Sequence, residues 1–342
     1  MASPPSTSRA WQFSSAKGGL DKNLHINDSA AVPKPGPQQH LVQIIACAVN
    51  PIDYKLVELP FIGGFLGGKN ATPCRDFAGR IVTPAAGSPL KAGQLVFGLA
   101  GASPIAGGAM AQYALATDTA VTSIPQGLDP VDAATVGIAG LTGYQTIAPY
   151  VKQGDKVFLN GGSGGVGVFA IQFAKSFGCH VTTSCSTANV DLCKKLGADD
   201  VVDYKKGDVV DALVASGKKF DHVVDNVGYP STLYYRAHEF TTPEAKFVVV
   251  GGEFSYNAIT TTFGRLFRPG FLGGGKRKLI SYMMKPTVED LNSIGKLMSE
   301  GKVKAIVDTK FLFEEGAKAF EKIKTGRAKG KIVVVVDEKA GQ

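Results

Sequence analysis

The sequence predicts an α/β protein in which a doubly wound parallel sheet accompanies a smaller, β-rich domain. Short strands and turns fill the first 125 residues, whereas helices and strands alternate from about residue 129 to residue 250. A strand, a glycine-rich turn and a helix follow one another at residues 156–175. A chain of 342 residues is also longer than one hydrophobic core usually serves, so we expect two domains.

The first 125 residues contain apolar segments of strand length. The clearest are His40–Val49, Gly79–Val82 and Leu95–Leu99, and proline- and glycine-rich connections separate them. No clear amphipathic helix interrupts this pattern. The segment therefore predicts a small barrel-like domain.

Alternating elements predict the parallel sheet, because each strand is followed by a crossover of helical pattern. The predicted helices are 129–147, 189–196 and 208–215, and the predicted strands are 157–159, 180–185, 200–203, 221–225 and 246–250. Asp129 or Asp132 is placed to cap the first helix. Two further helices (288–300 and 314–324) and a strand (331–336) have no evident core of their own, and we expect them to complete the two domains.

The glycine-rich turn has the G-x-G-x-x-G spacing at Gly162, Gly164 and Gly167. In this pattern one glycine permits a sharp turn, the next lets the backbone approach a pyrophosphate, and the third lets helix and strand pack closely. The helix N-terminus also favours negative charge. We therefore predict a dinucleotide site at Ser163, Gly164, Gly165 and Val166; the alternative is a purely structural glycine-rich turn.

Composition excludes several classes of protein. Hydrophobic residues make up 44% and charged residues 19%, and no apolar run is long enough to span a membrane. The N-terminus lacks the apolar core of a secretory signal, so we expect a cytoplasmic protein, with a transit peptide as the weaker alternative. The net charge of +8 is too diffuse to indicate nucleic-acid binding. The five cysteines form no C-x-x-C pair, which favours reduced thiols.

Several motifs occur in the order seen in one superfamily: CAVNPIDYK, DFAG, LTGYQ, GGSGGVG, KLGADDVVDY, DNVG and GRAKGKIVV. Over nearly its whole length the chain resembles the medium-chain dehydrogenase/reductase superfamily, and within it the zinc-independent quinone oxidoreductases and enone or enoyl reductases. The resemblance implies a GroES-like catalytic domain (residues 1–125 and 270–342), into which a Rossmann domain (126–269) is inserted. It also implies an active site in the cleft between them.

The chain departs from the zinc enzymes of this superfamily at their ligand positions. Asn50 and Arg75 stand where those enzymes have Cys and His, and the lobe with four closely spaced cysteines is missing. A catalytic zinc needs three protein ligands, and a guanidinium cannot serve as one. We therefore expect no metal.

The segment that follows the second strand of the sheet predicts the cofactor. A site that selects NAD has an acid about 20 residues after the glycines, but Thr183–Thr187 contains none. Small hydroxyls can donate to the 2′-phosphate of NADPH. We therefore predict NADPH bound by Ser186, with Asn189 and Tyr204 beside it, as the resemblance also implies. The basic partner is open: Lys194 and Lys195 are candidates or ordinary surface charges.

The resemblance places the NPID segment against the nicotinamide. Asn50, Tyr54 and Lys55 are its polar candidates, and either Tyr54 or Lys55 could stabilise a developing enolate. Each could equally be structural, as a packed aromatic or a surface charge, and Asp53 more plausibly caps the next turn. By resemblance, Thr142, Asn226 and Gly251 flank the nicotinamide half. His222 and His238 invite catalytic interpretations, although His222 lies within a predicted strand.

These observations predict an NADPH-dependent reductase of an activated C=C bond, in an enone or enal, or of a quinone. The alternatives are an enoyl reductase of a fatty-acid or polyketide pathway and a non-catalytic, lipid-associated NADPH-binding factor. The expected partner is a small-molecule substrate, and the protein is expected to be a monomer or homodimer. The basic, aromatic segment 263–280 could contact an anionic membrane or a lipid-droplet surface, although a loop beside the substrate cleft or a subunit contact is the simpler interpretation.

Overall fold

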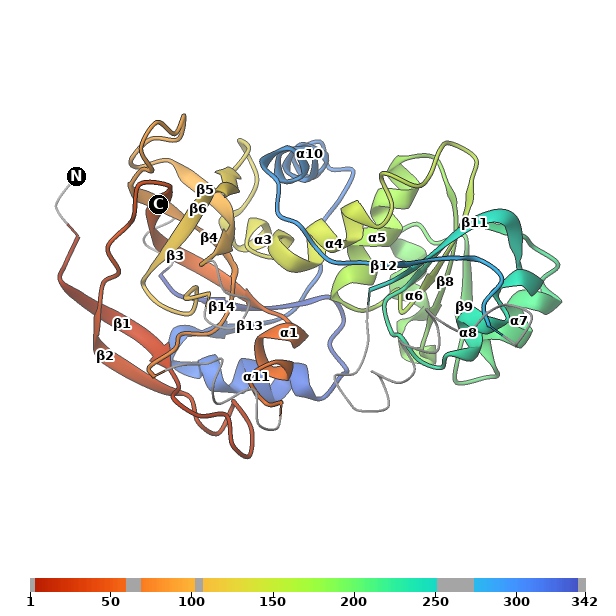
Figure 1. Ribbon diagram of the computed structural model, residues 1–342, viewed down its shortest axis with the longest axis horizontal. Coiled ribbons are helices and arrows are strands. Elements are labelled where there is room, and N and C mark those ends of the chain that lie inside the picture. Colours follow the sequence, from red (N-terminus) through yellow and green to blue (C-terminus); the bar gives the residue numbers. More distant parts are fainter. Residues whose placement is uncertain (1–3, 60–68, 102–106, 251–273, 338–342) are drawn as a thin grey trace. The chain divides into compact units, whose positions relative to one another are not determined.

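The computed structural model describes residues 4–59, 69–101, 107–250 and 274–337. The chain divides into two compact units (Figure 1). Unit 1 comprises Met1–Leu141 and Lys285–Gln342, and unit 2 is Thr142–Met284. The predicted domain boundaries, after residues 125 and 269, lie before the boundaries of these units, which follow Leu141 and Met284. The first shift has a physical reason: the helix α3 (Pro130–Ala133) and the π-helical turn Val136–Gly140 pack on the strands of unit 1.

Unit 1 is built on a mainly antiparallel sheet of six strands in the order β13-β14-β3-β4-β5-β6. Strand β3 also pairs with β6, so that β3 to β6 close into a barrel. Strand β14 extends the barrel sheet by pairing with β3. The bounds are β3 Gln39–Val49, β4 Asp76–Thr83, β5 Leu95–Ala100, β6 Tyr113–Ser123, β13 Val307–Leu312 and β14 Lys331–Val335. The predicted barrel-like domain is confirmed.

A two-stranded ribbon that the sequence pattern did not reveal lies in unit 1. Strands β1 (Thr7–Gln12) and β2 (His25–Ala31) pair antiparallel (Figure 1). Residues of β1 help to form the core, where Trp11 donates from Nε1 to the carbonyl of Phe313 at 2.6 Å. The described α-helices of unit 1, besides α3, are α1 (Pro51–Lys55), α10 (Val288–Ser299) and α11 (Gly316–Lys324). The two C-terminal helices match their predicted ranges to within two residues.

Unit 2 contains a six-stranded sheet in which every pairing is parallel, in the order β12-β11-β10-β7-β8-β9. The bounds are β7 Lys156–Asn160, β8 His180–Cys185, β9 Asp200–Asp203, β10 Phe220–Asp225, β11 Thr241–Val249 and β12 Lys278–Ser281. The order reverses between β7 and β10, as in a Rossmann fold. The predicted doubly wound sheet is confirmed, and ligands of such sheets bind at the carboxyl ends of the strands beside the reversal.

Helices flank this sheet (Figure 1). Those in the described residues are α4 (Leu141–Gln145), α5 (Gly165–Ser176), α6 (Val190–Lys195), α7 (Val209–Ala215) and α8 (Thr232–Tyr235). Local sequence sets their ends: Asp208 caps α7 by accepting from the Asp211 amide, and Gly197 follows α6 with a φ of +104°. Among the described residues, no helix is long and apolar enough to cross a membrane.

Candidate active site

The glycine-rich turn joins β7 to α5 at the carboxyl edge of the parallel sheet. Gly161 has a φ of +83° and makes the sharp turn, a role that the sequence had assigned to Gly162. Gly162 is required for another reason, because a Cβ there would lie 2.1 Å from Thr183 Oγ1. A Cβ at Gly167 would lie 2.3 Å from the Gly161 carbonyl oxygen, which confirms its role in close helix–strand packing.

Gly164 differs from these neighbours because none of the described residues requires a glycine there. Its φ of −79° and ψ of 172° suit any residue, and a Cβ would have its nearest neighbour at 3.6 Å. The space beside Gly164 is therefore available to a ligand, as the phosphate hypothesis requires.

The N-terminus of α5 provides the charge complement for such a ligand. This helix has 12 residues, no side-chain cap and no acidic residue in its first turn. Its first amides, including those of Gly165 and Val166, have no acceptor within the helix, and they coincide with the positive end of the helix dipole. Ser163 lies just before this helix, and its Oγ accepts from Asn189 Nδ2 at 3.0 Å. The arrangement suits a phosphate group.

A buried polar network holds the glycine-rich turn against the ends of the strands. The sequence analysis did not identify it. Asn160, the last residue of β7, donates from Nδ2 to Asp225 Oδ1 at 2.8 Å. Ser184 donates from Oγ to Asn160 Oδ1 at 2.5 Å and accepts from the Gly161 amide at 3.0 Å. The network thus ties the ends of β7, β8 and β10 together and fixes the turn against them.

Two buried acceptors at this edge have no partner. Asn189 Oδ1 and Asn226 Oδ1 are both inaccessible to solvent, and neither has a hydrogen-bond donor among the residues that the structure describes. Asn226 is fixed by its Nδ2, which donates to the Asn160 carbonyl at 3.2 Å. Because unsatisfied buried acceptors are costly, these atoms suit the hydroxyl groups of a bound ligand. With the open space at Gly164, they show that these residues fit a dinucleotide.

Ser186 and Tyr204 follow the ends of the neighbouring strands β8 and β9. Ser186 is half-buried, and its hydroxyl makes no hydrogen bond to any described residue. Tyr204 is 49% exposed, and Lys205 Nζ lies 5.5 Å from the centre of its ring. Asp203 carries a carboxylate beside them, which accepts from Thr187 Oγ1 at 2.7 Å. This hydrogen bond lowers the pKa of Asp203.

Three lysines of this region lie in different places. Lys194 and Lys195 occupy the last turn of α6, which runs back from the carboxyl edge of the sheet. They therefore lie at the opposite end of that helix from Asn189. Lys205 instead follows Tyr204 directly after β9, and the sequence analysis overlooked it.

The other predicted residues of unit 2 have mixed environments. Thr142 is buried in α4, and its carbonyl accepts from the Thr146 amide at 3.1 Å. His222 is fully buried in β10, donates from Nε2 to the Thr146 carbonyl at 2.7 Å, and has its pKa lowered to about 4 by burial. It is therefore a neutral core residue. His238 Nδ1 contacts the Tyr235 carbonyl at 3.3 Å. Gly251 lies outside the described residues.

Asn50, Tyr54 and Lys55 belong to unit 1, at the short helix α1. Adjacent helical residues point in different directions, so Tyr54 and Lys55 do not share a face. Tyr54 packs on the hydrophobic core, and Lys324 Nζ lies 5.5 Å from its ring centre, which supports the structural interpretation. Burial raises the Tyr54 pKa, which keeps its hydroxyl protonated. The Lys55 ammonium makes no hydrogen bond or ion pair with the described residues.

A buried charged cluster surrounds Asn50 and was not foreseen. Lys331 Nζ bonds to Asn50 Oδ1 and lies 3.1 Å from Asp76 Oδ2, with Lys331 and Asp76 exposing 2% and 0% of their side chains. Asp76 Oδ1 also accepts from the Ile138 amide at 2.8 Å. Asp53 accepts from the Asn50 amide at 2.7 Å, which confirms its structural role. Burial and the nearby Asp76 raise the Asp53 pKa to about 7.

The residues around Asn50 do not fit a zinc ion. The Lys331 ammonium already binds the oxygens of Asn50 and Asp76, and a second cation would be repelled there. The Arg75 guanidinium instead donates to the carbonyls of Ala100 and Gly101, at 3.2 and 3.3 Å. Within the described ranges, no group of three or more His, Cys, Asp and Glu residues is placed to hold a metal.

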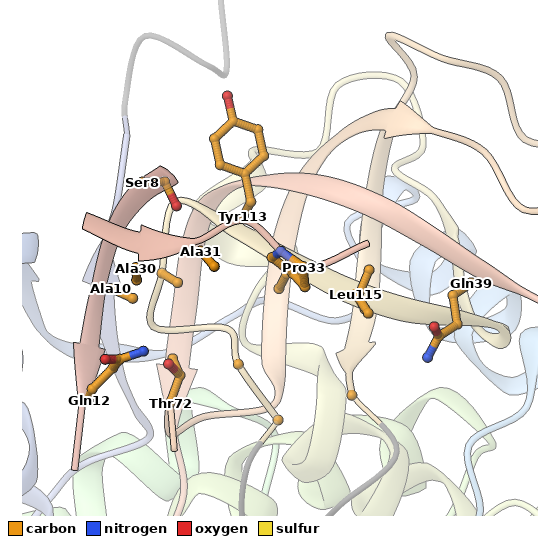
Figure 2. Close-up of a pocket in the computed structure, with 15 residues that line it drawn as sticks. Ser8, Ala10, Gln12, Ala30, Ala31, Pro33, Gln39, Thr72, Tyr113 and Leu115 are labelled. Atoms are coloured by element: carbon orange, nitrogen blue, oxygen red, sulfur yellow. The ribbon is translucent and has the colours of Figure 1, made fainter. Parts of the chain in front are cut away.

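A separate pocket of about 320 Å³ lies elsewhere in unit 1 (Figure 2). Small side chains from β1, β2 and β6 line much of it, including Ala10, Ala30 and Ala114. None of the predicted site residues lines this pocket. It is therefore no part of the candidate active site.

Comparisons with known proteins agree with this geometry. The alcohol dehydrogenase GroES-like domain family matches residues 36–126, and the zinc-binding dehydrogenase family matches residues 196–334. A trans-enoyl reductase of Aspergillus terreus, pgmF, is 48% identical over 98% of both chains. The chain belongs to the medium-chain dehydrogenase/reductase superfamily.

Two further similar proteins are a quinone-oxidoreductase homologue and a quinone oxidoreductase. A chloroplastic quinone-oxidoreductase homologue of Spinacia oleracea is 31% identical, over 95% of this chain and 97% of its own length. The structure of a quinone oxidoreductase from Coxiella burnetii matches with a TM-score of 0.81 and 28% identity, covering 96% of this chain and 99% of the other. The protein is an oxidoreductase, and its superfamily uses a nicotinamide cofactor.

Proposed function

We propose that this protein is an NADPH-dependent reductase that transfers a hydride, without zinc, to an activated C=C bond or to a quinone. The proposal rests on two observations. The residues around the glycine-rich turn of unit 2 fit a dinucleotide, and the residues around Asn50 in unit 1 do not fit zinc. Reduction of an enoyl group is the form that the 48% identical trans-enoyl reductase favours. Reduction of a quinone is the second form, supported by the quinone-oxidoreductase relatives.

NADPH is preferred to NADH because no carboxylate follows β8 at Ser186. The free Ser186 hydroxyl would donate to the 2′-phosphate, and Lys205 would supply positive charge near it. Tyr204 offers a half-exposed aromatic face for the adenine. Asp203 is an acid in the same region, and its two oxygens already accept from Thr187 and from the Lys205 amide.

The residues of the chain would divide the remaining work. When bound, the dinucleotide supplies the hydride. Asn189, Asn226 and the first amides of α5 would hold the cofactor, and Thr142 and Gly251 are proposed to flank its nicotinamide half. Conjugate reduction places negative charge on the carbonyl oxygen of the acceptor, so a donor must stabilise that oxygen. The proposed donors are the side-chain NH₂ of Asn50 and the Lys55 ammonium, which has no partner among the described residues. Tyr54 is a weaker candidate because its ring packs on the core.

The test is a turnover panel. Purified protein is mixed with NADPH and with enals, enones, quinones or enoyl thioesters, and the absorbance of the reduced nicotinamide is followed. We expect turnover with at least one acceptor, unchanged after treatment with a strong chelator. Binding of NADPH without turnover on any acceptor would refute the proposed function, and loss of activity with the chelator would refute its zinc-free form.

A further inference from the structure

Lys331 is an ammonium buried in unit 1 that the proposed reaction has not yet used. It lies at the start of β14, and its side chain is 2% exposed. Its acceptors are Asp76 Oδ2 at 3.1 Å, the Val49 carbonyl at 3.4 Å and Asn50 Oδ1. A buried charge is retained only when its partners satisfy it, and Asp76 provides the opposite charge.

This contact determines how the Asn50 amide is oriented. The two ends of an asparagine amide are distinguished by their hydrogen bonds, and an ammonium can only donate. The atom that faces Lys331 must therefore be the amide oxygen, so Nδ2 points away from Lys331. Among the described residues, the one partner of Nδ2 is the Ala48 carbonyl, at a long 3.4 Å. The second N–H bond has no acceptor among the described residues.

We propose that the Asp76–Lys331 pair is a positioning device that holds Asn50 as a hydrogen-bond donor to a carbonyl oxygen of the reacting complex. Asp76 is itself fixed, because its second oxygen accepts from the Ile138 amide at 2.8 Å. The resulting chain of contacts runs from Asp76 through Lys331 to Asn50. In zinc dehydrogenases the metal polarises the substrate oxygen. In this protein the Lys331 ammonium instead orients the neutral Asn50 side chain as a hydrogen-bond donor.

This inference rests on the proposed reductase function. Two carbonyl oxygens could receive the Asn50 N–H, that of the acceptor and that of the nicotinamide carboxamide. A donor to the acceptor oxygen strengthens its bond as negative charge develops, and therefore acts on kcat. A donor to the carboxamide acts on the binding of NADPH.

The test is a double-mutant cycle between Asn50 and the ion pair. Lys331→Met combined with Asp76→Asn, called the neutral-pair variant, removes both charges and leaves no buried ion unpaired. We expect it to lower kcat, or to weaken NADPH binding, by about tenfold or more, because loss of one such donor costs about 10² to 10³. In the Asn50→Ala background the same two changes should have less than about a twofold effect, because the donor is already absent.

The identity of the oxygen follows from which constant changes. Loss confined to kcat assigns the acceptor oxygen, and loss confined to the NADPH dissociation constant assigns the carboxamide. Equal effects of the neutral pair in both backgrounds would overturn the proposal, as would the absence of any effect. The matched control is Lys302→Met with Glu300→Gln, an exposed ion pair of unit 1 with an N···O distance of 2.8 Å. We expect it to leave both constants unchanged.

A spectroscopic measurement tests the positioning without turnover. In protein labelled with ¹⁵N at asparagine, the Asn50 side-chain signals are assigned by their loss in Asn50→Ala. We expect one sharp NH₂ pair in the wild type and a shifted, doubled or broadened pair in the neutral-pair variant. An unchanged pair would overturn the inference. If the wild-type protein turns over no acceptor, the proposed function fails, and this spectrum still decides whether Lys331 fixes the amide.

Discussion

Replacing Gly164 with alanine separates ligand binding from folding. The backbone at Gly164 suits alanine, and the added Cβ would meet its nearest atom at 3.6 Å, an ordinary contact. We therefore expect the free energy of unfolding to stay the same or to rise by about 0.4–1 kcal/mol, because alanine restricts the unfolded chain. The methyl group would, however, occupy the space through which we expect the pyrophosphate to approach.

The binding cost can be estimated from the hydrogen bonds that are displaced. A hydrogen bond to a charged group contributes roughly 1.5–3 kcal/mol. Losing one such bond at the first turn of α5 corresponds to a rise of about 10- to 150-fold in the NADPH dissociation constant. Calorimetric titration measures this constant, and urea unfolding measures the stability of the same protein.

Gly167→Ala is the matched comparison within the same turn. Its Cβ would lie 2.3 Å from the Gly161 carbonyl oxygen and 2.6 Å from Gly162 Cα, both of them backbone atoms. Overpacking of this kind costs about 1–3 kcal/mol of stability. The prediction is wrong if Gly164→Ala binds NADPH as tightly as the wild type, or if Gly164→Ala is less stable than Gly167→Ala.

Three further predictions concern specificity, pH and thiols. Ser186→Asp should shift the ratio of NADPH to NADH affinity about tenfold or more toward NADH, because a carboxylate repels the 2′-phosphate; an unchanged ratio in titrations with both cofactors would show that this loop does not contact the 2′ position. Because the Asp53 pKa is raised to about 7, the folded state retains a proton that the unfolded state loses near pH 4. The wild type should therefore lose stability relative to Asp53→Asn as pH rises from about 4 to about 7, by at most about 4 kcal/mol, and urea titrations with parallel pH profiles for the two proteins would contradict this. All five cysteines are buried, so a thiol reagent should label almost none of them in the native protein and all of them in urea; rapid labelling of the native protein would indicate local opening.

Strand and helix patterns predicted unit 2 closely because its signals are local. Strands β8 and β9 have the bounds that the sequence indicated, since each is a short apolar or β-branched run that ends at polar or turn residues. The helix expected over residues 129–147 was less accurate. It is divided by a π-helical turn at Val136–Gly140, where the Ile138 amide donates to Asp76, and that long-range contact has no local signature.

Features that depend on contacts between residues far apart in the chain could not be predicted from the sequence. The segment of β2, HINDSAA, is too polar to indicate a strand, and its pairing with β1 provides the missing stability. Lys331 was part of a quoted motif, but nothing local places it against Asn50, 281 residues away. The segment 263–280 was also hard to interpret. Residues 263–273 lie outside the described part, while Arg277 donates to Thr241 Oγ1 at 2.9 Å and Lys278 begins β12.

The position of β14 has a consequence for the order in which the protein matures. Unit 2 is one continuous stretch, so it can fold on the ribosome while residues beyond it are still being added. Unit 1 must wait, because β14 pairs with β3 only after translation has passed residue 331. Until then Asp76 lacks its counter-ion, so burial of its unpaired carboxylate in the nascent unit would be unfavourable. A chain interrupted before β14 would thus leave this edge of β3 unpaired and Asp76 without its counter-ion, a state that proteases readily remove.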